Sequence, residues 1–219
     1  MNIQNYSSGM IGTNCYLVWD EASKEGMIVD PGGYVSQIEN VVETEGLTVK
    51  YIVLTHGHGD HIGGVTEFHE KYPDALLVAG ENEAELLGNP RMNMSGDFGG
   101  RPESFEADIW VKEKDEITLG DLHFVIFETP GHTPGGITLY VADGSAIKDE
   151  GISGVAITGD TLFRESIGRT DFPGGDFNVL ADSIRTKLYT LPLDTVVLPG
   201  HMGFTTIEYE VINNPFVRS

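Results

Sequence analysis

The chain has 219 residues, of which 34 are acidic and 13 are basic, giving a formal charge of −21 at pH 7. Apolar residues make up 40% of it and charged residues 21%, which excludes a disordered chain and is enough for one sizeable core. Nucleic acid and anionic membrane surfaces attract clustered Lys and Arg, so this acidic balance argues against both as partners.

Predicted elements in the first half are short and bounded by turn residues. In chain order they are a hairpin (15–19 and 26–30), a helix (35–45), a strand (50–55), a helix (62–71) and a strand (75–79). The run over 50–55 is continuously apolar, which is typical of a strand buried on both faces. It ends directly at His56.

The second half repeats this pattern. Its predicted elements are strands over 122–129, 137–141, 154–158 and 195–198, and a helix over 178–190. Strands that alternate with helices indicate an α/β fold built in layers. Four apolar strands each stop just before a His or an Asp, namely His56, His132, Asp160 and His201, so we expect these side chains to meet at one edge of the sheet.

The interval between the two halves is different. A short acidic helical piece begins near Glu81, and residues 88–108 then show no clear period. Long loops without secondary structure are often functional in compact domains, so this one is either a substrate lid or a solvated connection. No low-complexity linker interrupts the sequence, and we expect a single domain over residues 1–219.

A single cysteine, Cys15, allows no intrachain disulfide and no cysteine-rich zinc site. We expect a buried, reduced thiol on an early strand. The sequence has no apolar stretch of about 18 residues and no basic, then apolar, N-terminal leader. The expected compartment is therefore the cytoplasm.

The strongest chemical signal is the segment 55–64, which reads THGHGDHIGG. It places His56, His58, Asp60 and His61 within six residues, and the glycines at 57 and 59 let the backbone fold so that all four converge. Imidazole nitrogen and carboxylate oxygen suit zinc, iron or manganese. Four such groups are hard to explain by packing alone.

Three further groups fit the same site: His132, Asp160 and His201, each in a Gly-containing turn. Seven groups are more than one metal needs and suit two divalent ions that share a carboxylate. His69 and His123 have no such context and are interpreted as structural or surface residues.

These motifs, in this order, resemble those of the metallo-β-lactamase superfamily, and within it the glyoxalase II-like branch of small hydrolases. The resemblance extends from residues 13–16 through 29–33 to 213–216. It implies an αβ/βα sandwich with the metal site at the edge of its two sheets. It assigns the first metal to His56, His58 and His132, the second to Asp60, His61 and His201, and the bridge to Asp160.

The resemblance also implies a reaction, hydrolysis of a small acyl thioester such as S-lactoylglutathione. Two zinc ions, or iron or manganese in their place, would lower the pKa of a shared water and supply hydroxide for attack on the carbonyl carbon. Asp60 would also orient that hydroxide as a catalytic residue. Asp30 is either a hydrogen-bonding partner of a ligand histidine or an ordinary turn residue.

The substrate-binding residues implied by the resemblance lie in the loop 168–175. Arg169 suits bidentate recognition of a substrate carboxylate, or it pairs with Asp171. Phe172 lies in the same loop. Full-length glyoxalase II enzymes carry a C-terminal helical domain that holds glutathione, whereas about 18 residues follow His201 here, which puts glutathione as the thiol in doubt.

Three other functions remain open on the sequence. A persulfide dioxygenase of the same fold would use a single iron held by two His and one Asp. A lactonase or β-lactamase would use the same ligand order. A metal-binding module without catalysis is the third, and the complete ligand set argues against it.

Overall fold

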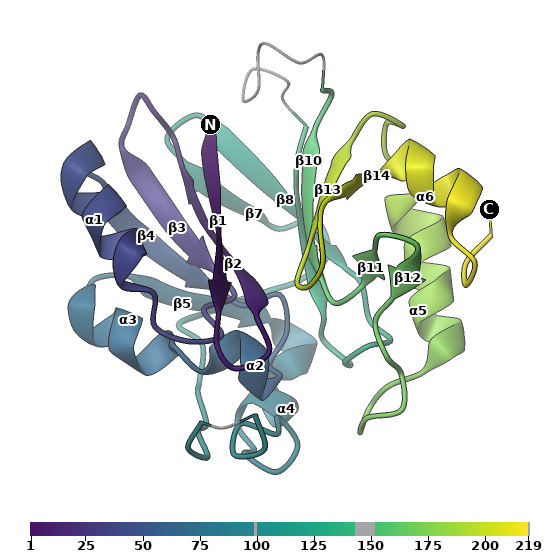
Figure 1. Ribbon diagram of the computed structural model, residues 1–219, viewed down its shortest axis with the longest axis horizontal. Helices are drawn as coiled ribbons and strands as arrows, with labels where there is room; N and C mark the ends of the chain where they lie inside the picture. The colour runs from purple at the N-terminus through teal and green to yellow at the C-terminus, as the bar shows by residue number, and fades with distance from the viewer. Residues whose placement is uncertain (99, 143–151, 219) are drawn as a thin grey trace.

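Apolar runs fold into two six-stranded mixed sheets that face each other, in a computed structural model that describes residues 1–98, 100–142 and 152–218 (Figure 1). The first sheet runs β1 (Asn2–Ser8), β2 (Thr13–Trp19), β3 (Glu25–Val29), β4 (Thr48–Val53), β5 (Leu76–Gly80), β6 (Ile109–Val111). The second runs β14 (Thr205–Thr206), β13 (Val196–Pro199), β10 (Val155–Gly159), β9 (Ile137–Val141), β8 (Leu122–Glu128), β7 (Glu116–Leu119).

Helices cover the outer face of each sheet (Figure 1). Those on the first sheet are α1 (Ser36–Glu45) and α3 (Val65–Lys71). Those on the second are α5 (Phe177–Ser183), which continues as a π-helical turn over Ile184–Leu188, and α6 (Ile207–Asn213). The order helix, sheet, sheet, helix confirms the predicted αβ/βα sandwich.

Three layers of apolar side chains fill the spaces between the four layers of helices and sheets. Strand β2 is buried on both faces, so Leu17 packs under α1 and α3 while Val18, one residue on, packs between the sheets. Phe124 meets Val18 from the other sheet in the same central layer. Leu180 and Ile207 form the third layer, beneath α5 and α6. Cys15 is fully buried in the first layer as a free thiol, as expected.

Most predicted elements are present, with shifted ends. The 15–19 and 26–30 hairpin is β2 paired with β3, and the helix over 35–45 is α1, which ends at Gly46 with φ 66°. The helix expected over 62–71 is instead a short α2 (Gly59–Ile62) followed by α3. The break falls at Gly63 and Gly64, where the backbone of Gly64 donates to the carbonyl of Pro31 at 2.7 Å.

Several elements gave no clear sequence signal. Strand β1 is polar and lies at an edge, where one side needs no partner. The others are the short pieces β6, β7, β14, α6 and the two-stranded hairpin of β11 (Leu162–Phe163) with β12 (Ser166–Ile167). The prediction that four strand ends meet at one edge of one sheet is corrected: β4 lies in the first sheet and β8, β10 and β13 in the second.

The interval after β5 starts with the expected acidic helical piece, a 3₁₀ turn over Glu81–Glu83 and α4 (Ala84–Leu87). The described part of 88–108 has no helix or strand, yet it is anchored. Asn93 is fully buried and donates to the carbonyls of Leu87 and Glu103. Its own carbonyl accepts from the backbone of Gly59 at 2.6 Å. The loop is thereby fastened to the segment that carries His58 and Asp60.

No helix in the described part of the chain is both long and apolar enough to cross a membrane.

Hydrogen bonds from β2 fasten the end of the second sheet to the first. Asn14 donates from its side chain to the carbonyls of Pro199 and Met202, both at 2.9 Å. The hydroxyl of Tyr16 donates to the same Pro199 carbonyl at 2.7 Å. These bonds fix both sides of His201, so the two sheets meet in a defined register at this point.

We predict that Asn14→Ala lowers the free energy of unfolding of the metal-free protein by about 1–3 kcal/mol, because it removes two hydrogen bonds between the sheets and leaves the Pro199 carbonyl with Tyr16 as its side-chain donor. Urea denaturation followed by circular dichroism measures this. Asn213→Ala, which removes an exposed helix-surface amide, is the matched control and should change stability by less than about 0.5 kcal/mol. Equal stability of Asn14→Ala and the wild type would contradict this tether.

Candidate metal centre

Four of the seven predicted groups come from the connection after β4. His56 and His58 lie in the loop, and Asp60 and His61 lie on α2, whose tight turn directs them to the same side. All four are at least nine-tenths buried. Burial of three histidines and an aspartate on six residues is costly unless they share a positive partner.

The other three groups come from the second sheet. His132 follows β8, Asp160 follows β10 and His201 follows β13. Their ligand atoms lie within 4.8 Å of those of the first loop, in the sets His56–His58–His132, His56–His61–Asp160 and Asp60–His61–His201. The structure therefore brings together all seven residues that the sequence singled out.

In the first set, ring nitrogens face one another. Nε2 of His132 lies 2.9 Å from Nδ1 of His58 and 3.2 Å from Nε2 of His56. Tetrahedral ligands about 2.0–2.1 Å from a zinc ion are about 3.3–3.4 Å apart. The three rings thus have nearly the mutual spacing of ligands around one ion.

The second set is built around carboxylates. Oδ2 of Asp60 lies 3.1 Å from Nε2 of His201 and 3.4 Å from Nε2 of His61. Asp160 lies between the two sets, with Oδ1 3.4 Å from His61 Nε2 and Oδ2 3.6 Å from Nε2 of both His132 and His201. Oδ1 of Asp160 and Nε2 of His61 are buried without a hydrogen-bond partner among the described residues. A buried carboxylate oxygen without a partner, such as Oδ1 of Asp160, fits a cation.

In His132, His61 and His56, the ring nitrogen that points away from the cluster has a polar contact of its own. Nδ1 of His132 donates to the carbonyl of Arg169 at 2.7 Å, which leaves Nε2 as the lone pair that faces the cluster. Nδ1 of His61 lies 3.0 Å from Oδ2 of Asp30. His56 Nδ1 lies 3.2 Å from the hydroxyl of Thr55, and that hydroxyl donates to Asp30 at 2.6 Å.

Asp30 therefore supports two of the rings, one directly and one through Thr55. It is fully buried, has a positive φ of 52° and also accepts from the backbone of Thr55 at 2.7 Å. Of the two interpretations left open by the sequence, the contact with His61 is the one that the structure shows.

The pKa shifts in the cluster leave two kinds of metal ligand, neutral imidazole and ionised carboxylate. Burial lowers the pKa of His56 and, with neighbouring His132, lowers that of His58 to about 3, so both rings are neutral. Burial would raise the pKa of Asp60 and Asp160, but the charge on His61 outweighs it and holds both below the ordinary value. Burial opposes the charge on His61, yet Asp60 and Asp160 raise its pKa well above the ordinary value. Neutral imidazoles beside ionised carboxylates are donors for divalent transition metals.

Glu83 is a buried carboxyl next to the cluster that the sequence pattern did not reveal. It is fully buried, and its two oxygens accept from the backbone of Gly57 at 2.9 Å and of Gly135 at 2.7 Å. Gly57 lies between two of the histidines and Gly135 belongs to the turn after His132, so one carboxyl clamps both loops. Burial raises the pKa of Glu83 to about 7, against the effect of these two donors. In the sequence it is indistinguishable from Glu81 and Glu85.

The two predicted substrate residues flank the cluster. Phe172 lies edge-on to the ring of His58, with 5.6 Å between centroids. Arg169 is exposed and makes a bidentate pair with Asp171, at 2.8 and 2.7 Å, while its guanidinium lies 3.7 Å from the centre of the Phe172 ring. Of the two interpretations of Arg169, the structure therefore shows the pairing with Asp171.

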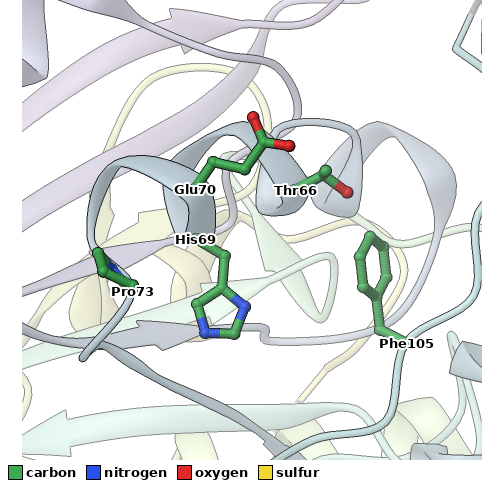
Figure 2. Close-up of a pocket in the computed structure, with 5 residues that line it drawn as sticks. All are labelled: Thr66, His69, Glu70, Pro73 and Phe105. Carbon is green, nitrogen blue, oxygen red and sulfur yellow. The ribbon is translucent and has the colours of Figure 1, made fainter.

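A cavity of about 360 Å³ opens onto the cluster and is lined by His58, Asp60, His132, Asp160 and His201. Another, of about 400 Å³, lies on α3 away from these residues (Figure 2). In Figure 2, His69 and Glu70 point in different directions, so they do not form a joint ligand set. His123 is exposed and pairs with Glu116. His69 and His123 thus lie outside the cluster, in keeping with their sequence interpretation.

Comparison with known proteins agrees with this geometry. A family model described as the metallo-beta-lactamase superfamily matches residues 9–201. The hydroxyacylglutathione hydrolase GloC of Haemophilus influenzae is 37% identical over 222 residues, which cover 100% of this chain and 99% of that protein.

Two solved structures share the whole architecture. The BLEG-1 B3 metallo-beta-lactamase has a TM-score of 0.86 and 35% identity, covering 100% of both chains. TTHA1623 in a di-iron-bound form has a TM-score of 0.82 and 30% identity, covering 98% of this chain and 100% of that one. The chain therefore belongs to the metallo-beta-lactamase superfamily, whose members are generally hydrolases, and carries a His- and Asp-rich group able to hold metal.

We predict that Glu83→Gln weakens zinc affinity by about 10- to 100-fold, because one of the two backbone donors then faces an amide NH₂ in place of an acceptor. Competition with a chromophoric chelator measures the affinity. Glu85→Gln, an exposed neighbour on α4, is the matched control and should bind zinc as the wild type does. Unchanged affinity in Glu83→Gln would show that the clamp has no bearing on the metal loops.

Proposed function

We propose that this protein is a dinuclear metal hydrolase that cleaves a small acyl thioester of the S-lactoylglutathione type. The observation that carries the proposal is the convergence of all seven groups in two sets of three, with Asp160 between them. His56, His58 and His132 would hold one ion, and Asp60, His61 and His201 the other.

The residues present fit two divalent ions. The group consists of ring nitrogens and carboxylate oxygens and has no thiolate. Asp160 Oδ1 and His58 Nε2 are buried without a hydrogen-bond partner among the described residues. Zinc is our first choice, with iron or manganese compatible with the same donors. The similar chain TTHA1623 has been solved in a di-iron-bound form. When bound, such a pair supplies Lewis acidity that polarises a carbonyl and activates water at neutral pH.

The chain's own groups would orient the reactants. Asp60 lines the cavity, and its Oδ2 is held by the hydroxyl of Thr13 at 3.3 Å and by His201. We assign it to accept a hydrogen bond from the attacking water and aim the water at the carbonyl carbon. Phe172 and Arg169 form the wall of the cavity next to His58 and would contact the part of the substrate that does not react.

The loop 88–108 is proposed as the cover of this cavity. Phe98 reaches the cavity wall, and the anchored Asn93 ties the same loop to Gly59. A cover of this kind excludes bulk water from the reacting carbonyl.

One comparison favours thioesters over other substrates. GloC, which is similar to this chain over nearly its full length, is named a hydroxyacylglutathione hydrolase. The partner is then a small molecule, with no nucleic acid or membrane surface involved. We place the reaction in the cytoplasm, where the lone buried thiol of Cys15 stays reduced.

A single-iron persulfide dioxygenase needs two His and one Asp. Here a second set of ligand groups, Asp60, His61 and His201, also converges, with His201 partly buried, and this favours a site for two ions. A β-lactamase would use the same seven groups, so the test includes a β-lactam.

We predict that the zinc- or iron-loaded protein hydrolyses S-lactoylglutathione or a simple S-acyl thiol. Asp60→Ala and His132→Ala should lower kcat/KM by at least about 100-fold. Thiol release is followed with a disulfide reagent. His123→Ala, far from the site and exposed, is the control and should retain full activity.

Two results would contradict the proposal. One is equal activity of Asp60→Ala, His132→Ala and wild type. The other is no turnover of any thioester, with either oxygen uptake on glutathione persulfide or rapid opening of a β-lactam.

A further inference from the structure

The cavity next to the metal cluster has apolar walls. Apart from the cluster residues, its lining consists of Ser166, Arg169 and six apolar side chains: Ile11, Phe98, Phe163, Ile167, Phe172 and Met202. These come from five separate loops or hairpins, so the apolar character is not a by-product of one segment. At about 360 Å³ the cavity is at the small end of the range for ligand pockets.

The walls contact both metal sets. Phe172 meets the ring of His58 edge-on, and Phe163 meets the ring of His201 with 6.2 Å between centroids. A carbonyl group placed at the cluster would therefore have apolar surface on either side of it.

Arg169 is the only cationic side chain among the described residues that line the cavity. Its Nε and Nη2 atoms donate to Asp171, and its face lies on Phe172. The pair holds the pKa of Asp171 at about 2, so the Asp171 charge persists at neutral pH. A substrate carboxylate would have to displace Asp171 or bind Nη1 beside it, and in both cases the negative charge of Asp171 opposes it.

The mouth of the cavity is also apolar. Ile11 is 52% exposed and Met202 61% exposed, although both line the cavity. Asn14 connects the two loops by donating to the carbonyl of Met202. Large apolar side chains held at the entrance of a pocket indicate an apolar ligand.

We propose that this cavity selects thioesters whose non-reacting part is an uncharged apolar chain, in preference to glutathione thioesters with their two carboxylates. The inference rests on the proposed hydrolase function and narrows its substrate class. In the reaction, the water oxygen bonds to the carbonyl carbon, the carbon–sulfur bond breaks and a water proton goes to sulfur. The products are a carboxylic acid and a thiol.

The test measures kcat/KM of the zinc-loaded protein on acetyl, butanoyl and hexanoyl thioesters of the neutral thiol N-acetylcysteamine and on the matching glutathione thioesters. A second arm keeps the acetyl group and lengthens an alkyl thiol, which tells whether the apolar chain lies on the acyl or the sulfur side. We expect kcat/KM to rise by about fourfold per buried methylene in one arm. For the same acyl group, kcat/KM on the N-acetylcysteamine thioester should exceed that on the glutathione thioester by at least about tenfold.

Two pairs of variants distinguish the effect of the cavity wall from that of other exposed apolar side chains. Ile11→Ser with Met202→Ser should reduce the gain per methylene to below about twofold. The matched pair Met10→Ser with Phe204→Ser removes apolar side chains of the same two loops that are more exposed and do not line the cavity, and should leave the series unchanged. Asp171→Asn should raise activity on glutathione thioesters relative to neutral ones by about two- to fivefold, because it frees Arg169.

Calorimetry of product binding gives a readout that needs no turnover. Hexanoate should bind more tightly than butanoate by about 15-fold, with a more negative heat-capacity change. A flat response to chain length in both arms, or a preference for the glutathione carrier, would overturn the inference while leaving the hydrolase intact. Failure to hydrolyse any thioester would instead contradict the proposed function. The calorimetric series would then test by itself whether the cavity prefers apolar ligands.

Discussion

The constraint on which the rest of the structure depends is the close approach of buried lone pairs where the two sheets meet. Ring nitrogens of His56, His58 and His132 approach within 2.9–3.2 Å, and carboxylate oxygens of Asp60 and Asp160 lie 3.1–3.6 Å from other rings. The charge on His61 offsets only one of the two negative charges of Asp60 and Asp160, and the neutral rings of His56 and His58 add none. Further positive charge would stabilise this buried group, and divalent cations would supply it.

Surrounding residues make this approach possible, and each acts at a different point. Asp30 orients His61 directly and His56 through Thr55. Glu83 clamps the backbone of the loops that carry His58 and His132. Asn14 fastens the loop with His201 to the opposite sheet. Gly200 leaves room for this closure, because a side chain there would collide with Asp160 and His61. Rigid support of this kind fixes ligand geometry before any ion binds.

The sequence predicted the site far better than its supports. His56, His58, Asp60 and His61 are close together along the chain, and the turns with His132, Asp160 and His201 each follow a strong apolar run, so local pattern was sufficient. Glu83 could not be distinguished, because its burial depends on two loops that meet only in the folded chain. Strand β1 was missed since its polar residues pair with β2 at an edge. The sequence left two interpretations of Arg169 open, and the fold shows that it pairs with Asp171.

The central claim is that the junction of the sheets holds two metal ions, and metal content tests it most directly. Elemental analysis of protein loaded with excess zinc and then desalted should give two ions per chain in the wild type. In His201→Ala, which keeps His56, His58 and His132 intact, it should give about one. One ion per chain in the wild type, unchanged in His201→Ala, would contradict the account.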